Sequence, residues 1–184
     1  TLAFGDVSGK GAAAALYGSL MSGLLRTVAR RRRNPAGLMK ALNDALIVRK
    51  VEARYVTLLL LLWHSHSRHF TMANAGAIPP MICRHRQILK LRVEGVPLGL
   101  LPDREYEEVS FQAESGDMLV LYSDGIPDHL SPSGEEYGRA RLSHVVTRNC
   151  DLTAQAVIDA IFADLDRFNR EPFDDQTLAV LKVK

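Results

Sequence analysis

The sequence predicts an α+β protein in which two antiparallel sheets pack on each other and pairs of helices lie outside them. Two observations lead to this prediction. Most β-rich runs follow one another without an intervening helix, and the helical patterns occur in two pairs. Alternating strand–helix units are absent, which argues against a Rossmann-type fold. No repeat or Pro/Ser-rich linker divides the 184 residues, so one domain spanning 1–184 is expected.

The expected elements can be justified in chain order. The chain starts inside a short strand, "TLAF", and the helical spacing of Leu16, Leu20, Leu24 and Val28 predicts a helix over residues 11–33. Asn34 caps a second helix, 35–48, which has Pro35 at its first position. Runs of β-forming residues predict strands at 55–63, 69–75, 80–85, 87–93, 105–112 and 117–123, then helices at 138–148 and 153–169 and a last strand at 177–183.

Composition excludes several classes of protein. A net charge of +2 argues against a dominant nucleic-acid surface. The run "RRRR" at 30–33 is interpreted as a solvated helix end, and an acidic partner or membrane surface is the alternative. Cys83 and Cys150 have no CxxC spacing, which indicates neither a disulfide framework nor a zinc site and fits a cytoplasmic protein. The longest apolar run, 55–63, is too short for a bilayer, which needs about 20 residues.

The glycine-rich stretch "GDVSGKG", residues 5–11, looks at first like a phosphate-binding loop. Its spacing does not match the Walker pattern, and no Ser or Thr follows the lysine to bind magnesium. Asp6 would also repel a phosphate unless a divalent cation stood between the two. The alternative is a helix N-terminus with an acidic residue near the positive end of its dipole.

Acidic residues occur at three places in the sequence where a predicted strand begins or ends. Asp6 follows the first strand, Asp124 follows the apolar run "MLVLY", and Asp174 and Asp175 precede the last strand. If the last two strands pair in antiparallel fashion, the end of one and the start of the other lie at the same sheet edge. Clustered carboxylates need cations, and an oxygen-only donor set favours Mg²⁺ or Mn²⁺ over zinc. For any one position alone, an ordinary turn is the alternative.

Six collinear motifs resemble the PPM (PP2C-type) metal-dependent protein phosphatases, in the bacterial branch typified by SpoIIE and RsbU. They are "GDVSGKG", "NAGAIPP" (74–80), "GVPLGLLPD" (95–103), "LYSDGIPD" (121–128), "GEEYG" (134–138) and "DDQT" (174–177). The resemblance implies a PP2C-like β-sandwich flanked by pairs of antiparallel helices, with two metal ions at one end. It also implies hydrolysis of phosphoserine or phosphothreonine in a protein by in-line attack of a metal-activated water.

The same resemblance assigns roles to individual residues. Asp6 matches the aspartate that bridges the metals, and the backbone carbonyl of Val7 matches the ligand beside it. Asp124 matches the aspartate of the late DG motif, so Asp6 and Asp124 would act in catalysis through the metal-bound water. Asp174 matches the last ligand, and Asp175 is the alternative.

Two departures from the family pattern bear on activity. Relatives carry a further acidic ligand on a strand that precedes the "DVSG" motif, so we expect the domain to be truncated at its N-terminus and its metal binding to be weakened. Many relatives read "NAGH", whereas Ala77 stands here at the position of the histidine. The rival hypothesis is therefore a non-catalytic docking module of the same fold with an incomplete metal centre.

The resemblance also implies partner proteins and regulatory domains. Relatives dephosphorylate a STAS-domain antagonist of an anti-sigma factor and are commonly fused to upstream sensor or receiver domains, so such partners are expected here. In those relatives the first two helices carry regulation to the metal site.

His64, His66 and His69 are interpreted as a polar hairpin turn rather than a metal site. His129 is interpreted as a neutral residue of a surface loop, with a general acid as the alternative.

Overall fold

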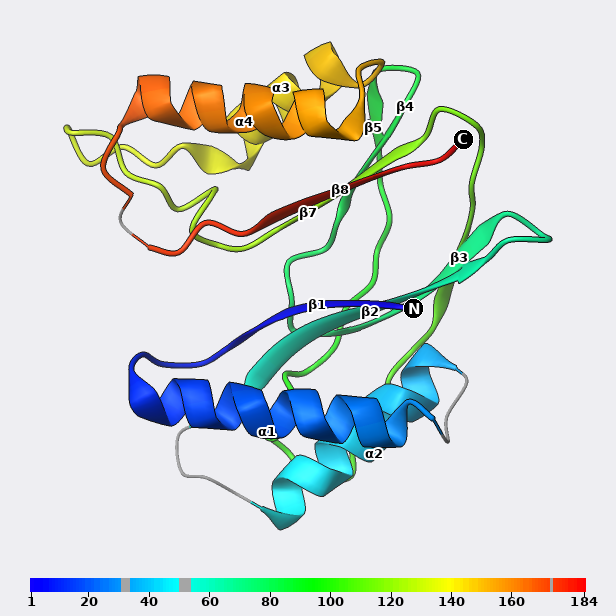
Figure 1. Ribbon diagram of the computed structural model, residues 1–184. Coiled ribbons are helices and arrows are strands. Elements are labelled where there is room, and N and C mark those ends of the chain that lie inside the picture. The colour runs from blue at the N-terminus through cyan, green and yellow to red at the C-terminus, as the bar shows by residue number, and fades with distance from the viewer. Residues whose placement is uncertain (31–33, 50–53, 173) are drawn as a thin grey trace. The chain divides into compact units, whose positions relative to one another are not determined.

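The computed structural model describes residues 1–30, 34–49, 54–172 and 174–184. They form two compact units, one made of 1–79 with 92–112 and the other of 80–91 with 113–184. Each unit contains one four-stranded antiparallel sheet and two helices (Figure 1). The prediction of an α+β protein with two antiparallel sheets and two helix pairs is confirmed.

The sheet of the first unit has the strand order β1-β2-β3-β6. Its strands are β1 (Leu2–Val7), β2 (Val56–His64), β3 (His69–Ala75) and β6 (Val109–Gln112). The helices α1 (Ala12–Val28) and α2 (Pro35–Val48) lie together on one face of this sheet (Figure 1).

The core of the first unit lies between α2 and the two central strands. Leu38, Leu42 and Leu46 recur every four residues on α2, and all three are buried. This spacing places them on one side of the helix, and they belong to the same buried cluster as Leu58 and Leu60 of β2. Removal of these apolar side chains from water stabilises the unit.

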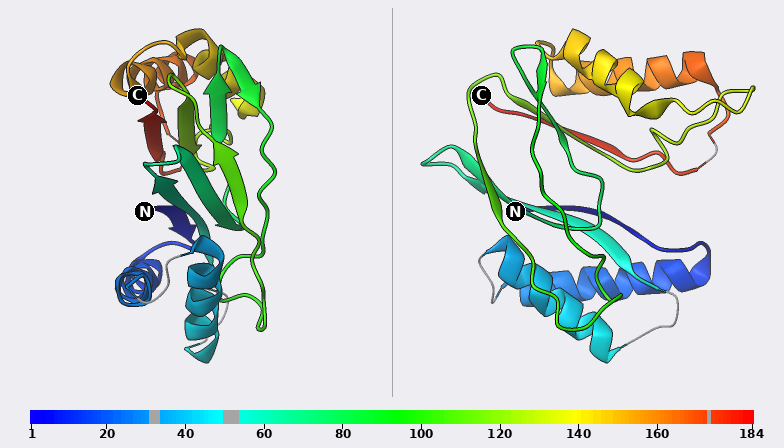
Figure 2. Two further views of the ribbon diagram at one scale, coloured as in Figure 1. Left: turned by 90° about the vertical axis from the view of Figure 1, so that its right-hand side faces the viewer. Right: turned by 180° about the vertical axis from the view of Figure 1, so that it is seen from behind.

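The sheet of the second unit has the strand order β5-β4-β7-β8. Its strands are β5 (Gln87–Leu89), β4 (Met81–Arg84), β7 (Met118–Tyr122) and β8 (Leu178–Lys182). The helices α3 (Gly138–Asn149) and α4 (Ala154–Phe168) lie side by side over it (Figure 2). All five residues of β7 are buried, as expected for a fully apolar central strand.

Two predicted strands are shorter than expected because tertiary contacts compete for their residues. The run 87–93 forms strand only to Leu89, and Val93 instead accepts a hydrogen bond from the Asn74 side chain at 2.9 Å. The run 105–112 forms strand only from Val109, since Tyr106 is buried in the core of the first unit. The first helix ends at Val28 rather than at residue 33, and residues 31–33 of the arginine run lie outside the described residues.

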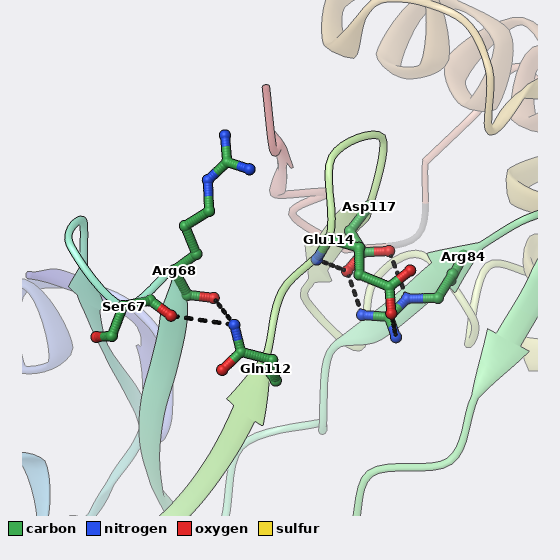
Figure 3. A network of polar contacts seen from close by, with 6 residues as sticks. All are labelled: Ser67, Arg68, Arg84, Gln112, Glu114 and Asp117. Carbon is green, nitrogen blue, oxygen red and sulfur yellow. Dashed lines mark hydrogen bonds and ion pairs between the residues drawn. The ribbon is translucent and has the colours of Figure 1, made fainter.

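Polar contacts hold the ends of the strands in both units. In the second unit, the Arg84 guanidinium donates to both carboxylate oxygens of Asp117, at 2.8 and 2.6 Å, and to Glu114 at 2.6 Å (Figure 3). In the first unit, the Gln112 amide donates to the backbone carbonyls of Ser67 and Arg68, at 3.0 and 3.1 Å (Figure 3). These bonds fix the turns that the strands enter and leave.

Candidate functional site

The SDG and DDQT motifs of the second unit are joined by hydrogen bonds. β7 and β8 pair in antiparallel register, with Tyr122 opposite Leu178, which is the pairing on which the expected meeting of Asp124 with Asp174 and Asp175 depended. The Ser123 backbone N–H donates to the Thr177 carbonyl at 3.0 Å, and the Thr177 N–H donates to the Ser123 hydroxyl oxygen at 2.9 Å. That hydroxyl donates in turn to the Asp175 carbonyl at 3.1 Å. The hydrogen bonding between β7 and β8 therefore continues into the two loops that carry Asp124 and Asp174.

Gly125 is needed for this close approach of the two loops. A Cβ atom added at Gly125 would overlap the backbone carbonyl oxygen of Asp175. A side chain at this position would push the DDQT loop away from the SDG loop. That displacement would strain the hydrogen bonds that Ser123 makes with the DDQT loop.

Four carboxylate side chains line a pocket of about 240 Å³ in the second unit. They belong to Asp124, Asp128, Glu136 and Asp174, and Gly125 and Leu130 complete the lining. Two of the predicted site residues, Asp124 and Asp174, are thus brought together. Asp175 is not part of this lining, and it contributes its backbone carbonyl to the Ser123 hydroxyl instead.

Asp128 and Glu136 were missed by the analysis of the sequence, although both lie in quoted motifs. Asp128 stands four residues after Asp124, and its N–H donates to the Asp124 carbonyl at 2.9 Å, which closes a helical turn and places both residues at the pocket. The i, i+4 spacing in "SDGIPD" was the available signal. Glu136 had no comparable signal, because it reaches the pocket through the loop that returns to α3.

The electrostatics of the pocket fit a cation. Burial raises the pKa of the Asp128 carboxyl above its ordinary value, and the negative charges of Asp124 and Glu136 raise it further. In the described part of the chain, no three acidic, histidine or cysteine side chains converge so as to hold an ion by themselves. The donor set suits Mg²⁺ or Mn²⁺ in kind, because such hard ions bind through one or two carboxylates and retain several waters.

Asp6 and Val7 are the last two residues of β1 in the first unit. Asp6 is exposed and lies opposite Thr57, whose hydroxyl donates to the Asp6 carbonyl at 3.4 Å. The sequence placed Asp6 after the strand, whereas pairing with β2 extends the strand through Val7. Gly5 permits that pairing, since a Cβ atom there would overlap the carbonyl oxygen of Thr57.

The "NAGA" motif has a structural role in the first unit. The Asn74 side chain accepts a hydrogen bond from the Ala77 N–H and donates to the Ala77 carbonyl, both at 2.9 Å. Gly76 has a φ of +73°, and its missing Cβ leaves room for Pro97 of the "GVPLG" motif. Ala77 is thus held through its backbone, which any residue except proline can supply at this position.

The histidines fall into two groups. His64 and His69 face each other across the hairpin that joins β2 and β3, with stacked rings whose centroids lie 4.1 Å apart, and His66 lies in the turn. The predicted hairpin is confirmed. The interpretation of His129 as a surface residue is wrong: its side chain is 2 % exposed and its Nε2 lies 2.9 Å from the Asn169 carbonyl. The hydrogen bond to the Asn169 carbonyl engages this nitrogen within the loop, which argues against the alternative role of His129 as a general acid.

Comparison with known structures defines the class of protein. The SiaA PP2C domain of Pseudomonas aeruginosa superposes with a TM-score of 0.88 at 18% identity, over 99% of this chain and 75% of that chain. The PP2C phosphatase domain of Bacillus subtilis SpoIIE, solved with a fragment of its regulatory domain, gives 0.82 at 24% identity, over 98% and 53% of the two chains. The chain therefore has the PP2C fold, as the motifs predicted.

The family follows from the sequence match. The family model described as stage II sporulation protein E (SpoIIE) matches residues 1–184, so the chain belongs to the SpoIIE family. Phosphoserine phosphatase RsbU of Bacillus subtilis (strain 168) is 27% identical over 186 residues, which cover 100% of this chain and 55% of RsbU. The chain thus spans about half the length of this relative.

Two other solved structures bear on metals and partners. RsbX was crystallised in complex with magnesium, and it superposes with a TM-score of 0.69 at 17% identity, over 99% of this chain and 80% of that chain. The RsbU and RsbW domains of Rv1364c from Mycobacterium tuberculosis give 0.78 at 21% identity, over 98% and 50% of the two chains. Among the described residues, no helix has both the length and the apolar character to cross a bilayer.

Proposed function

We propose that this chain is the catalytic domain of a metal-dependent phosphatase that hydrolyses phosphoserine or phosphothreonine on a protein. The observation that carries the proposal is the pocket in which Asp124, Asp128, Glu136 and Asp174 gather beside two interlocked loops. A concentration of like charge that raises a carboxyl pKa is unfavourable in isolation and is relieved by cations. Membership of the SpoIIE family supports the same activity.

The proposed metal ligands are the residues that the family motifs assign. They are Asp124 and Asp174 in the second unit, and Asp6 and the backbone carbonyl of Val7 in the first. Asp175 is the less favoured alternative to Asp174, since it is absent from the lining of the pocket. Two Mn²⁺ or Mg²⁺ ions, when bound, would activate a water for in-line attack and neutralise charge on the phosphoryl oxygens.

The chain itself contributes position and charge. Ser123 and Gly125 hold the two aspartate loops together, so that Asp124 and Asp174 need little reorganisation when an ion arrives. Asp128 and Glu136 add negative charge without being matched ligands, and we propose that they orient bound waters from the rim of the pocket.

We propose a partner and a setting as well. The substrate would be a phosphorylated STAS-domain protein that antagonises an anti-sigma factor, and an upstream sensor or receiver domain would regulate the site. A relative in which RsbU and RsbW domains occur in one protein supports this pathway. Two free, buried cysteines support a reducing compartment such as the cytoplasm.

The alternative is a docking module that binds the phosphorylated partner without turnover. The observation that favours it is that, among the described residues, no group of three side chains is arranged to hold an ion on its own. A phosphatase would then need a further ligand in addition to the side chains that line the pocket.

The test is manganese-dependent release of phosphate from a phosphoserine peptide. The 184-residue chain and the natural protein, with whatever precedes Thr1, are each compared with their Asp124→Ala variants. We expect release that requires Mn²⁺, is abolished by EDTA and is lost in Asp124→Ala. Folded protein without activity in both forms would support the docking module, and activity that survives Asp124→Ala would contradict the proposed site.

A further inference from the structure

His129 and Asn169 join the two loops of the acidic pocket by a second, reciprocal link. The His129 ring nitrogen Nε2 lies 2.9 Å from the Asn169 backbone carbonyl, and the Asn169 side-chain amide donates to the Leu130 carbonyl at 2.8 Å. His129 and Leu130 directly follow Asp128, and Asn169 is the residue at which α4 ends and the loop to Asp174 begins. The link thus joins the same two loops as the Ser123 bonds, at residues more distant along the chain.

The two ring nitrogens of His129 differ in their surroundings. A carbonyl oxygen can only accept, so Nε2 carries a proton and donates it to Asn169. The other ring nitrogen, Nδ1, is buried and has no hydrogen-bond partner among the described residues. A buried polar atom without a partner is unfavourable, so packing and stability alone do not explain a histidine at this position.

The backbone around His129 shows what the link holds. The His129 carbonyl accepts from the Tyr137 N–H, and the Pro127 carbonyl accepts from the Gly138 N–H, both at 2.8 Å. These bonds close the loop that carries Asp128 and Glu136 and lead directly into α3. On the other side, the Asn169 side-chain oxygen accepts from the Glu171 N–H at 3.2 Å, which turns the chain towards Asp174.

We propose that His129 and Asn169 are positioning residues that set the separation of the Asp124–Asp128 loop from the Asp174 loop and so tune cation affinity. This inference rests on the proposed function for its metal, but the link itself is a property of the metal-free chain. His129 acts through the backbone of Asn169 and touches neither substrate nor ion.

Matched substitutions separate positioning from packing. His129→Phe keeps an aromatic ring beside Phe168, whose centroid lies 6.0 Å from that of His129, and removes the Nε2 donor. His129→Gln keeps an Nε2 donor and removes the ring. Asn169→Ala removes the bond to Leu130 and the bond that the side-chain oxygen accepts from the Glu171 N–H. Asn149→Ala is the control, because it removes a similar bond, to Val145 at 2.8 Å, at the end of α3.

The first readout is amide hydrogen exchange of the metal-free protein at Tyr137, Gly138 and Thr177. We expect exchange to rise about two- to tenfold in His129→Phe and Asn169→Ala, as for the loss of one hydrogen bond. His129→Gln and Asn149→Ala should match the wild type. Equal exchange in His129→Phe and wild type, or an equal rise in Asn149→Ala, would overturn the inference.

The second readout is the dissociation constant of Mn²⁺ measured by calorimetry. We expect about tenfold weaker binding in His129→Phe, the low end of the effect of residues that support metal ligands, and recovery in His129→Gln. Unchanged affinity in His129→Phe would overturn the tuning role. A wild type that binds no Mn²⁺ would refute the proposed function and, with it, the tuning role, and the exchange measurement would still decide whether the link positions the loops.

Discussion

The NAGA and GVPLG motifs of the first unit serve a different purpose from the SDG and DDQT motifs of the second, although the sequence presents them alike. In the first unit, Asn74 and Gly95 are explained by packing: the Asn74 side chain closes its own turn, and a Cβ atom at Gly95 would overlap the Asn74 carbonyl. In the second unit, the motif loops gather carboxylates that repel one another. A motif residue that forms favourable contacts with its neighbours indicates a structural role. A motif residue whose charge is unfavourable beside its neighbours indicates a functional role.

The largest expected effect comes from the pocket itself. Asp124→Asn should lower manganese-dependent phosphate release more than about a hundredfold, because loss of a ligand should exceed the 10- to 100-fold effects typical of supporting residues. Without metal, the same variant should be slightly more stable to urea, because the charge that raises the pKa of Asp128 is removed. Urea unfolding in EDTA checks this predicted increase in stability. A variant that is less stable than the wild type would contradict the account in which the carboxylates of the pocket repel one another.

The next effect concerns an ion pair outside the pocket. Burial alone would raise the pKa of Asp117, but the Arg84 guanidinium and the Glu114 N–H outweigh it and hold that pKa below its ordinary value. Asp117→Asn should therefore cost about 2 kcal/mol at neutral pH, since it removes the buried carboxylate partner of a partly buried guanidinium and leaves it with the exposed Glu114.

The pH dependence of Asp117 has a defined sign. A pKa depressed by folding stabilises above the unfolded value of about 3.9, and that stabilisation is lost as the pH falls through the folded value. The difference in unfolding free energy between wild type and Asp117→Asn should thus narrow below about pH 4. A difference that is constant from pH 7 to pH 3 would show that the charge of Asp117 contributes nothing.

A pair of glycine substitutions compares the units directly. Gly125→Ala and Gly95→Ala each place a Cβ atom against a backbone carbonyl, so each should cost about 1–3 kcal/mol in unfolding experiments. Only Gly125→Ala should also weaken Mn²⁺ binding, because it displaces the Asp174 loop. Equal losses of affinity in both variants would remove the distinction between an architectural and a chemical motif.

The smallest effect concerns the core of the second unit. Burial and a hydrogen bond with Cys150 raise the pKa of the Cys83 thiol to about 12. At pH 8 its thiolate fraction should be about one in ten thousand, so a thiol reagent should not modify Cys83 in the native protein. Mass spectrometry after labelling, with and without denaturant, checks this. Rapid labelling of the native protein would contradict this prediction, because it would mean that the core of the second unit opens to solvent.

The sequence predicted the parts of the fold that depend on periodicity and composition. The apolar run of β2 and the four-residue spacing of α2 both follow from local patterns. The prediction was wrong where a distant partner competes. Residues 90–93 leave the strand because Asn74 binds Val93, and Tyr106 joins a core instead of a sheet.

The candidate site was predictable to the same extent. Asp124 and Asp174 could be placed together on the condition that their strands pair, because pairing fixes their sheet edge, and both residues line the pocket. Glu136 and the burial of His129 depend on how a long loop folds back on itself, and no local spacing encodes that path. The choice of Asp6 and Val7 as ligands remains a prediction.

The most direct test of the central claim is calorimetric titration of Mn²⁺ into the natural protein and its Asp174→Asn and Asp175→Asn variants. The two substitutions remove the same charge from adjacent residues, of which only Asp174 lines the pocket. The account predicts that Asp174→Asn loses most of the affinity and that Asp175→Asn retains it. Loss in Asp175→Asn alone, or equal affinity in all three proteins, would contradict a cation site built on this pocket.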